Sequence, residues 1–171
     1  SFEPAYLNLA RTGELTERVR VAYQHLEHCD LCAHHCGVNR HASIRGAVCR
    51  TGARAVVSSY NAHFGEEAPL VGCGGSGTIF FAWCNLRCQF CQNFEISQLG
   101  EGQAVEPEEL ATMMLELQAA ECHNINFVSP SHVVAPILAA TLIAAQAGLR
   151  LPLVYNTGGY DSPEALALLE G

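Results

Sequence analysis

The chain reads GSGTIFFAWCNLRCQFCQN from Gly75 to Asn93, a short apolar run followed by three closely spaced cysteines. Cys84, Cys88 and Cys91 have the spacing Cys-x3-Cys-x2-Cys. Three thiolates on one loop can hold three corners of a [4Fe-4S] cube and leave the fourth iron without a protein ligand. Catalytic metal sites keep such an open position for chemistry. The alternative is a zinc knuckle, but this loop offers three ligands where zinc takes four.

From Thr78 onward, apolar β-prone runs alternate with segments of helical periodicity. This pattern predicts helices that begin near Pro107, Ala135 and Ser162, after strands at 78–83, 125–129 and 151–156. Repeated βα units with apolar strands predict an α/β fold with a parallel sheet and right-handed crossovers. Three units cannot close a barrel, so we expect a partial (βα) barrel that belongs to a longer protein. The cysteines follow the first strand, and sites in such folds lie at the carboxyl ends of strands.

The sequence predicts two parts with different character. Residues 1–77 are expected to form an N-terminal helix and a Cys-rich extension that binds metal, and residues 78–171 the first three βα units. Within the first part, apolar residues recur at helical spacing from Leu15 to Leu26. The run 53–60 is β-prone and predicts one short strand.

A second group of cysteines lies in this extension, with the spacing Cys-x2-Cys-x3-Cys-x12-Cys. Its members are Cys29, Cys32, Cys36 and Cys49. Two interpretations are open. The four thiolates could hold a structural zinc, or they could hold an auxiliary iron–sulfur cluster, and spacing alone fits both. Nearby arginines could offset the thiolate charge, namely Arg40, Arg45, Arg50 and Arg54.

Composition and charge indicate the cellular compartment and argue against some classes of partner. The nine cysteines occur at ligand spacings and no secretory signal is evident, so we expect metal-bound thiolates in a reducing cytoplasm. The net charge is −8, and the chain has no lysine. Residues 61–171 hold two arginines against twelve acidic residues. This acidic balance argues against nucleic acid or an anionic membrane as the main partner.

The motif Cys84-x3-Cys88-x-Phe90-Cys91 resembles the signature of the radical S-adenosylmethionine (SAM) superfamily. The surrounding residues, from Gly75 to Cys88, resemble the branch that contains the pyruvate formate-lyase activating enzyme. More narrowly, they are similar to an uncharacterised group of homologues of those activases. The resemblance extends from about Leu7 to the last residue.

The resemblance implies a [4Fe-4S] cluster whose open iron chelates SAM. One electron from the reduced cluster would cleave SAM and give a 5′-deoxyadenosyl radical that abstracts a hydrogen atom. The implied partners are an electron donor such as flavodoxin or ferredoxin and a protein or peptide substrate, as in the activation of a glycyl radical enzyme. The protein would supply binding, orientation and exclusion of side reactions.

By the same resemblance, further residues become candidates for contact with the cofactor. Phe90 would pack near the adenine, although a core aromatic is an equal alternative. Asn93 could bond to cluster sulfides or to SAM, or be a solvated loop residue. Asn156, after the third predicted strand, could bond to SAM or substrate, or simply serve turn formation.

After the second predicted strand, activases carry a Gly-Gly-Glu-like stretch whose backbone meets the SAM amino group. Here the matching residues run from Ser129 through Ser131 to His132. Backbone carbonyls could keep the contact although the side chains differ. His132 is a candidate acid or base near the cavity, with a structural histidine as the favoured alternative.

Two other functions stay open from sequence. One is a non-catalytic zinc or iron–sulfur binding module that touches nucleic acid through its arginine-rich extension; it predicts a basic surface with interleaved aromatic residues. The other is a radical SAM enzyme that acts on a small metabolite.

Overall fold

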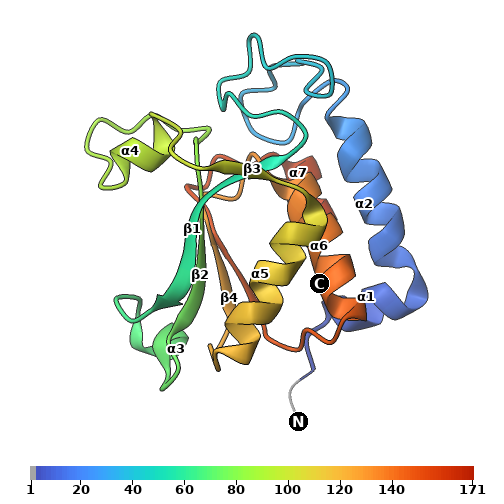
Figure 1. Cartoon of the computed structure of the whole chain (residues 1–171). Coiled ribbons are helices and arrows are strands. Elements are labelled where there is room, and N and C mark those ends of the chain that lie inside the picture. The colour runs from blue at the N-terminus through green and yellow to red at the C-terminus, as the bar shows by residue number, and fades with distance from the viewer. Residues whose placement is uncertain (1–2) are drawn as a thin grey trace.

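The computed structural model describes residues 3–171 and contains seven helices and five strands within that range. In chain order they are α1 Tyr6–Thr12, α2 Glu14–His25, β1 Ala55–His63, α3 Ala68–Val71, β2 Ser76–Phe81, α4 Phe94–Ser97, β3 Gln103–Val105, α5 Pro107–Ala119, β4 Ile125–Val128, α6 Val134–Gln146, β5 Leu153–Asn156 and α7 Pro163–Leu169. The strands form one sheet in the order β3-β1-β2-β4-β5 (Figure 1).

The sheet is mixed rather than parallel. β2, β4 and β5 run parallel to one another, which confirms the three predicted strands and their direction. β1 pairs with β2 in the antiparallel sense, and so does β3 with β1. The prediction of a parallel sheet is therefore wrong for these two strands, because a β-prone run does not reveal the direction of its partner.

Local sequence signals account for the helices of the βα units. α5 begins with Pro107 in its first turn, and Glu106 and Glu109 form a reciprocal capping box. α7 begins at Ser162, whose hydroxyl accepts a hydrogen bond from Ala165 N (3.2 Å). The predicted helix starts are confirmed within one or two residues. The short elements α1, α3, α4 and β3 lay outside the prediction.

The core lies between one face of the sheet and the helices α5 and α6, with α2 packed outside α6 (Figure 1). Ile79 and Phe81 of β2 and Phe127 of β4 point into this layer and are buried. α6 is apolar around most of its circumference because it is covered on both sides, as expected for a helix inside the molecule. Tyr6 of α1 also enters the core, and its hydroxyl donates to Leu151 O (2.8 Å).

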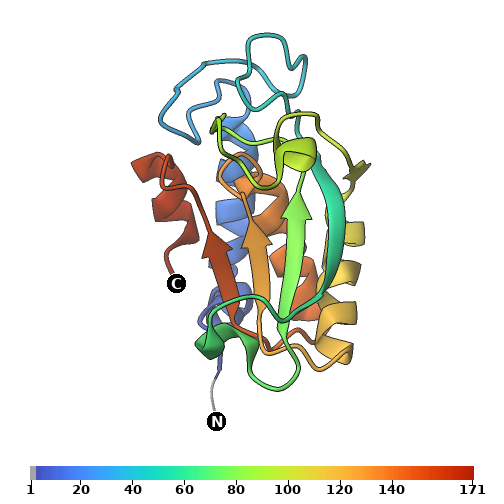
Figure 2. The same ribbon diagram turned by 90° about the vertical axis from the view of Figure 1, so that its left-hand side faces the viewer.

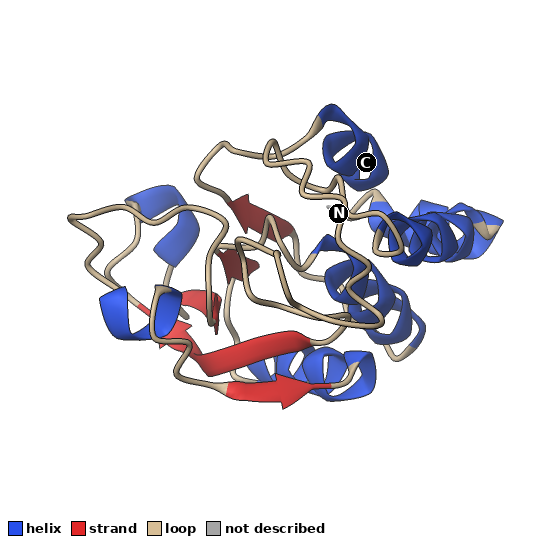
Figure 3. Cartoon of the chain, turned by 90° about the horizontal axis from the view of Figure 1, so that it is seen from above, coloured by secondary structure: helices blue, strands red, loops and turns tan. Residues whose placement is uncertain are grey.

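The parallel strands end together at the top of the molecule in Figure 2, which we call the carboxyl edge. Seen from above, the strands follow an arc and loops pass over their ends (Figure 3). Residues 26–54, here called the head segment, connect α2 to β1 over this edge and contain no regular helix or strand. Within residues 3–171, no helix is long and apolar enough to cross a membrane.

Candidate functional site

The cysteine loop, residues 82–93, follows β2 directly at the carboxyl edge. The chain turns sharply at Trp83, which has a positive φ of 63°. Trp83 N donates to Ile96 O (2.9 Å), which ties the start of the loop to α4. A side chain on Gly100 would collide with the Trp83 ring at 2.2 Å, so glycine is required there for the ring to pack. This packing sets the direction in which the loop leaves the sheet.

The loop brings the thiols of Cys84, Cys88 and Cys91 close enough for their charges to interact. All three thiols are free. Burial raises the pKa of the Cys84 thiol, hydrogen bonds from Leu86 N–H and the Ser129 hydroxyl lower it, and the other two cysteines raise it. Leu86 N lies 3.3 Å from Cys84 Sγ, and Cys91 Sγ lies 3.2 Å from Ser97 Oγ. The Cys84 sulfur thus accepts a hydrogen bond from the backbone and the Cys91 sulfur is within hydrogen-bond distance of a hydroxyl, while Cys88 is exposed.

No three Cys, His, Asp or Glu side chains among residues 3–171 are grouped closely enough to hold a single metal ion. A single zinc takes all its ligands around one ion, whereas in a cubane cluster each thiolate binds a separate iron.

The loop after β4 lies beside the cysteine loop. Ser129 has a positive φ of 58°, uncommon for a residue with a side chain, and its N–H donates to Asn156 O after β5 (3.1 Å). Ser131 Oγ lies 2.9 Å from Thr157 Oγ1. The predicted residues Ser129, Ser131 and Asn156 therefore meet at the carboxyl edge. The Asn156 residue as a whole is exposed.

His132 is a buried structural histidine. Its Nε2 donates to Ala82 O (3.0 Å), so that this nitrogen carries the proton. Burial, and secondarily the positive charge of Arg40, lower its pKa to about 4. Nδ1 is buried and has no hydrogen-bond partner among the described residues. The side chain is enclosed beneath the edge, which supports the structural alternative over a role as acid or base.

Two other candidates are exposed. Phe90 has 89 % of its surface accessible, so the alternative of a core aromatic is wrong. Asn93 is also exposed, and its carbonyl accepts from Ser97 N (2.8 Å) at the start of α4. Both side chains are free to meet a ligand on the cysteine loop.

The head segment touches the loop after each parallel strand. His34 Nε2 donates to Asn85 O (2.7 Å) in the cysteine loop. Arg40 Nη2 donates to His132 O (2.6 Å) after β4. Ala33 N donates to Tyr160 O (3.2 Å) after β5. Both groups of cysteines therefore lie at the same edge, which the sequence did not reveal.

Arg40 and Asn126 are residues whose placement the sequence did not predict. Asn126 is the polar member of β4, buried, and neither polar atom of its side chain has a partner among the described residues. It is paired in register with Thr78 and Val154, so these three share the sheet face opposite the α5–α6 layer. A lone Asn in an apolar strand was the available signal, because a buried amide without a partner is costly.

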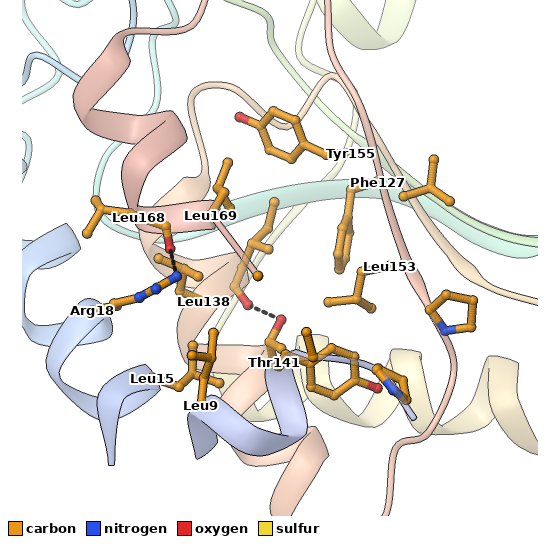
Figure 4. Close-up of a pocket in the computed structure, with 17 residues that line it drawn as sticks. Leu9, Leu15, Arg18, Phe127, Leu138, Thr141, Leu153, Tyr155, Leu168 and Leu169 are labelled. Carbon is orange, nitrogen blue, oxygen red and sulfur yellow. Dashed lines mark hydrogen bonds between the residues drawn. The ribbon is translucent and has the colours of Figure 1, made fainter. Parts of the chain in front are cut away.

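An apolar cavity lies elsewhere. It measures about 380 Å³ and is lined from α1, α2, α6, α7, β4 and β5 (Figure 4). Its walls are mostly apolar, and two of its polar side chains are already engaged: Thr141 Oγ1 donates to Ile137 O and Arg18 to Leu168 O. None of the predicted site residues lines this cavity, so the chemistry is expected at the carboxyl edge.

Comparison with known proteins agrees with this placement. Residues 78–171 match the family described as the Radical SAM superfamily. The uncharacterized protein MJ0674 of Methanocaldococcus jannaschii is 31 % identical over 172 residues, which cover 96 % of this chain and 48 % of that protein. This chain thus spans about half the length of the curated relative. No solved structure matches the chain significantly. The family match covers more than half of the chain and indicates an enzyme: the chain belongs to the radical SAM superfamily.

Proposed function

We propose that this chain carries the cofactor site of an activase-like radical enzyme, in which Cys84, Cys88 and Cys91 hold a [4Fe-4S] cluster. The observation that supports this most directly is three free thiols on one loop at the end of β2, within the part that matches the family. When bound, the cluster and SAM supply a carbon radical that takes a hydrogen atom from the substrate.

The residues of the cysteine loop fit such a cluster by their chemistry. Cluster ligands are thiolates, and hydrogen bonds to the sulfurs tune the reduction potential. The Leu86 N–H and the Ser129 hydroxyl already provide such bonds at Cys84. Because Ser129 is also held through its N–H to Asn156 O, the loop after β4 is fixed next to the cluster position.

The protein's own part in the reaction is to hold and orient SAM. The unpartnered amide of Asn126 offers one donor and one acceptor from the sheet face opposite α5 and α6. Ser131 and Asn156 offer further polar groups at the top of the same strands. Exposed Phe90 provides an aromatic face on the cysteine loop for the adenine.

Exposed apolar residues near the loop support a protein or peptide substrate over a small metabolite. Phe90, Phe94 and Leu99 are 89 %, 44 % and 56 % accessible, and all three lie in or just after the cysteine loop. Contiguous exposed apolar side chains mark interaction surfaces, and we infer that these three, which lie within ten residues of one another in the chain, contribute to one. A partial barrel completed by further strands beside β5, in a protein as long as MJ0674, would add to this surface.

The test of the cofactor is anaerobic reconstitution with iron and sulfide, chemical reduction in place of flavodoxin or ferredoxin, and electron paramagnetic resonance with and without SAM. We expect a reduced-cluster signal that changes when SAM is added, and release of 5′-deoxyadenosine. Replacement of all three loop cysteines by serine should remove the SAM-dependent change of the signal and the release of 5′-deoxyadenosine, whereas Cys73→Ser, an exposed thiol outside the loop, should remove neither. A wild-type signal of which no part changes with SAM would contradict the proposal.

The substrate class requires a separate test. Extract from cells grown in deuterated medium is separated by size into a protein fraction and a small-molecule fraction. Each is incubated with reduced enzyme and unlabelled SAM. Deuterium in 5′-deoxyadenosine from the protein fraction alone is the expected result. Transfer from the small-molecule fraction would instead identify a metabolite as the substrate.

A further inference from the structure

The head segment gathers four free thiols in a region with no regular secondary structure. Cys29 and Cys49 are buried, and Cys32 and Cys36 are half-buried. Two backbone hydrogen bonds, Cys29 N to Val38 O (3.1 Å) and Gly37 N to Cys29 O (3.0 Å), fold the chain back so that Cys36 lies beside Cys29. Coulombic interaction links Cys32 and Cys36 to both buried cysteines. A long irregular segment of this kind needs something to hold it.

Arg40 places a positive charge at the centre of this group. It is 3 % exposed. Its guanidinium donates to Thr51 O, Gly52 O and His132 O at 2.8, 2.8 and 2.6 Å, and Nη1 lies 3.5 Å from Cys29 Sγ. Among the salt bridges of the described residues, none involves Arg40.

A buried charge is costly unless an opposite charge accompanies it. The carbonyls around Arg40 supply hydrogen bonds but no net charge. Among the hydrogen-bond partners of the guanidinium within residues 3–171, the Cys29 sulfur is the one that can become an anion, and a thiol that coordinates a metal is deprotonated. The burial of Arg40 against Cys29 is therefore explained if Cys29 is a metal-bound thiolate.

The position of the group favours iron–sulfur chemistry, because the head segment contacts the cysteine loop through the hydrogen bond from His34 Nε2 to Asn85 O. Zinc would take all four thiolates around one ion. In a [4Fe-4S] cube each thiolate binds a separate iron, and four cysteines complete the coordination. We propose that Cys29, Cys32, Cys36 and Cys49 hold a second, fully coordinated iron–sulfur cluster, with Arg40 as its buried counter-charge.

This second centre would brace the cysteine loop from both sides of Cys84. Arg40 holds the His132 carbonyl, and the His132 ring holds the Ala82 carbonyl, two residues before Cys84. His34 holds the carbonyl of Asn85, the residue after Cys84. These hydrogen bonds connect the head segment to the backbone on both sides of Cys84, where the first cluster is expected.

The test uses the full chain with Cys84, Cys88 and Cys91 replaced by serine, which leaves the head segment intact. After anaerobic reconstitution, iron, acid-labile sulfide and zinc are measured per chain, together with the visible absorption. We expect about four iron and four sulfide to remain, the content of one cluster. Adding Cys32→Ser and Cys36→Ser should remove them, and adding Cys73→Ser in their place should not.

Two results would overturn the inference: a loop variant that binds no iron, or one that holds a single zinc and no sulfide. Neither result depends on whether the head substitutions disturb folding, because the decisive protein keeps all four head cysteines. Failure of the proposed function is judged separately, by the SAM-dependent change of the signal in the wild-type protein.

Discussion

The two groups of cysteines lie at the same edge of the sheet but in opposite surroundings. In the head segment, two of four thiols are buried and one contacts the buried guanidinium of Arg40. In the cysteine loop, no thiol is fully buried, Cys88 is exposed, and Phe90 beside it is 89 % accessible. A closed group with a matched counter-charge suits a structural role, whereas an open group leaves space for a cofactor and a substrate. Burial and charge, rather than cysteine spacing, therefore distinguish the structural group from the group expected to hold a cofactor.

The largest expected effect is the loss of a ligand from the open group. Cys88→Ser should reduce SAM cleavage by more than about 100-fold, because loss of outer-shell partners alone costs metal sites up to that factor. The measurement is the amount of 5′-deoxyadenosine released by the reduced enzyme. Cys73→Ser should leave the amount unchanged. Substantial SAM cleavage by the Cys88 variant would show that Cys88 is not a required cluster ligand. The open group of cysteines would then have no catalytic role that distinguishes it from the closed group.

Next comes the counter-charge of the closed group. Arg40→Met should lower the free energy of unfolding by about 2 kcal/mol, since it leaves buried carbonyls without their charged donor. Denaturant titration under anaerobic conditions measures the change. Arg45→Met, an exposed arginine of the same segment, should stay within about 0.5 kcal/mol of wild type. If both substitutions lower the free energy of unfolding by the same amount, the buried contacts of Arg40 do not contribute to stability.

The pH dependence of stability tests the connection between the two groups. His132 has a pKa of about 4 in the folded protein, and Arg40 is the charged group that faces it. Between about pH 6.5 and 4 the unfolded chain binds a proton at His132 that the folded chain does not, so stability should fall on acidification. The slope from this group is at most about 1.4 kcal/mol per pH unit.

Substitution His132→Gln should remove this part of the acid sensitivity, and urea titrations at several pH values measure it. Ser43→Ala, an exposed position of the head segment that removes no titratable group, is the control and should keep the wild-type slope. If the His132 variant also keeps the wild-type slope, the ring is not held neutral between Ala82 and Arg40.

The smallest expected effect concerns the third loop that the head segment contacts. Ser162→Ala removes the cap of α7, beside the loop that carries Tyr160, and should cost about 1 kcal/mol of stability. SAM cleavage should be unaffected, because neither group of cysteines loses a contact. Ser43→Ala, an exposed turn residue of the head segment, should cost less. A loss of cleavage on Ser162→Ala would show that this loop supports the open group as well.

Much of the fold could be predicted because its signals are local. The periodicity of the apolar residues and the turn and capping residues placed β2, β4 and β5 and the helices between them within a few residues. The three-cysteine motif pointed to the family, which the match of residues 78–171 confirms. The parallel part keeps the chain order β2, β4, β5, as expected for successive βα units whose strands lie next to one another.

The rest could not be predicted because it depends on contacts between distant residues. The antiparallel pairing of β1 is such a case, since its sequence predicts a strand but no partner. The contact of His34 with Asn85 spans 51 residues and that of Arg40 with His132 spans 92. No local pattern encodes which of several arginines is buried or which of several histidines is enclosed.

By itself, the sequence determined the chemistry available to this protein: seven cysteines in two groups with ligand spacing, alternating strands and helices, and a strand that leads into the three-cysteine loop. Only the tertiary structure decided that both groups meet at the carboxyl edge, that Arg40 is buried against Cys29, and that Phe90 is exposed. The physical reason is that ligand spacing and periodicity are properties of neighbouring residues, whereas burial and charge pairing arise when the chain closes on itself.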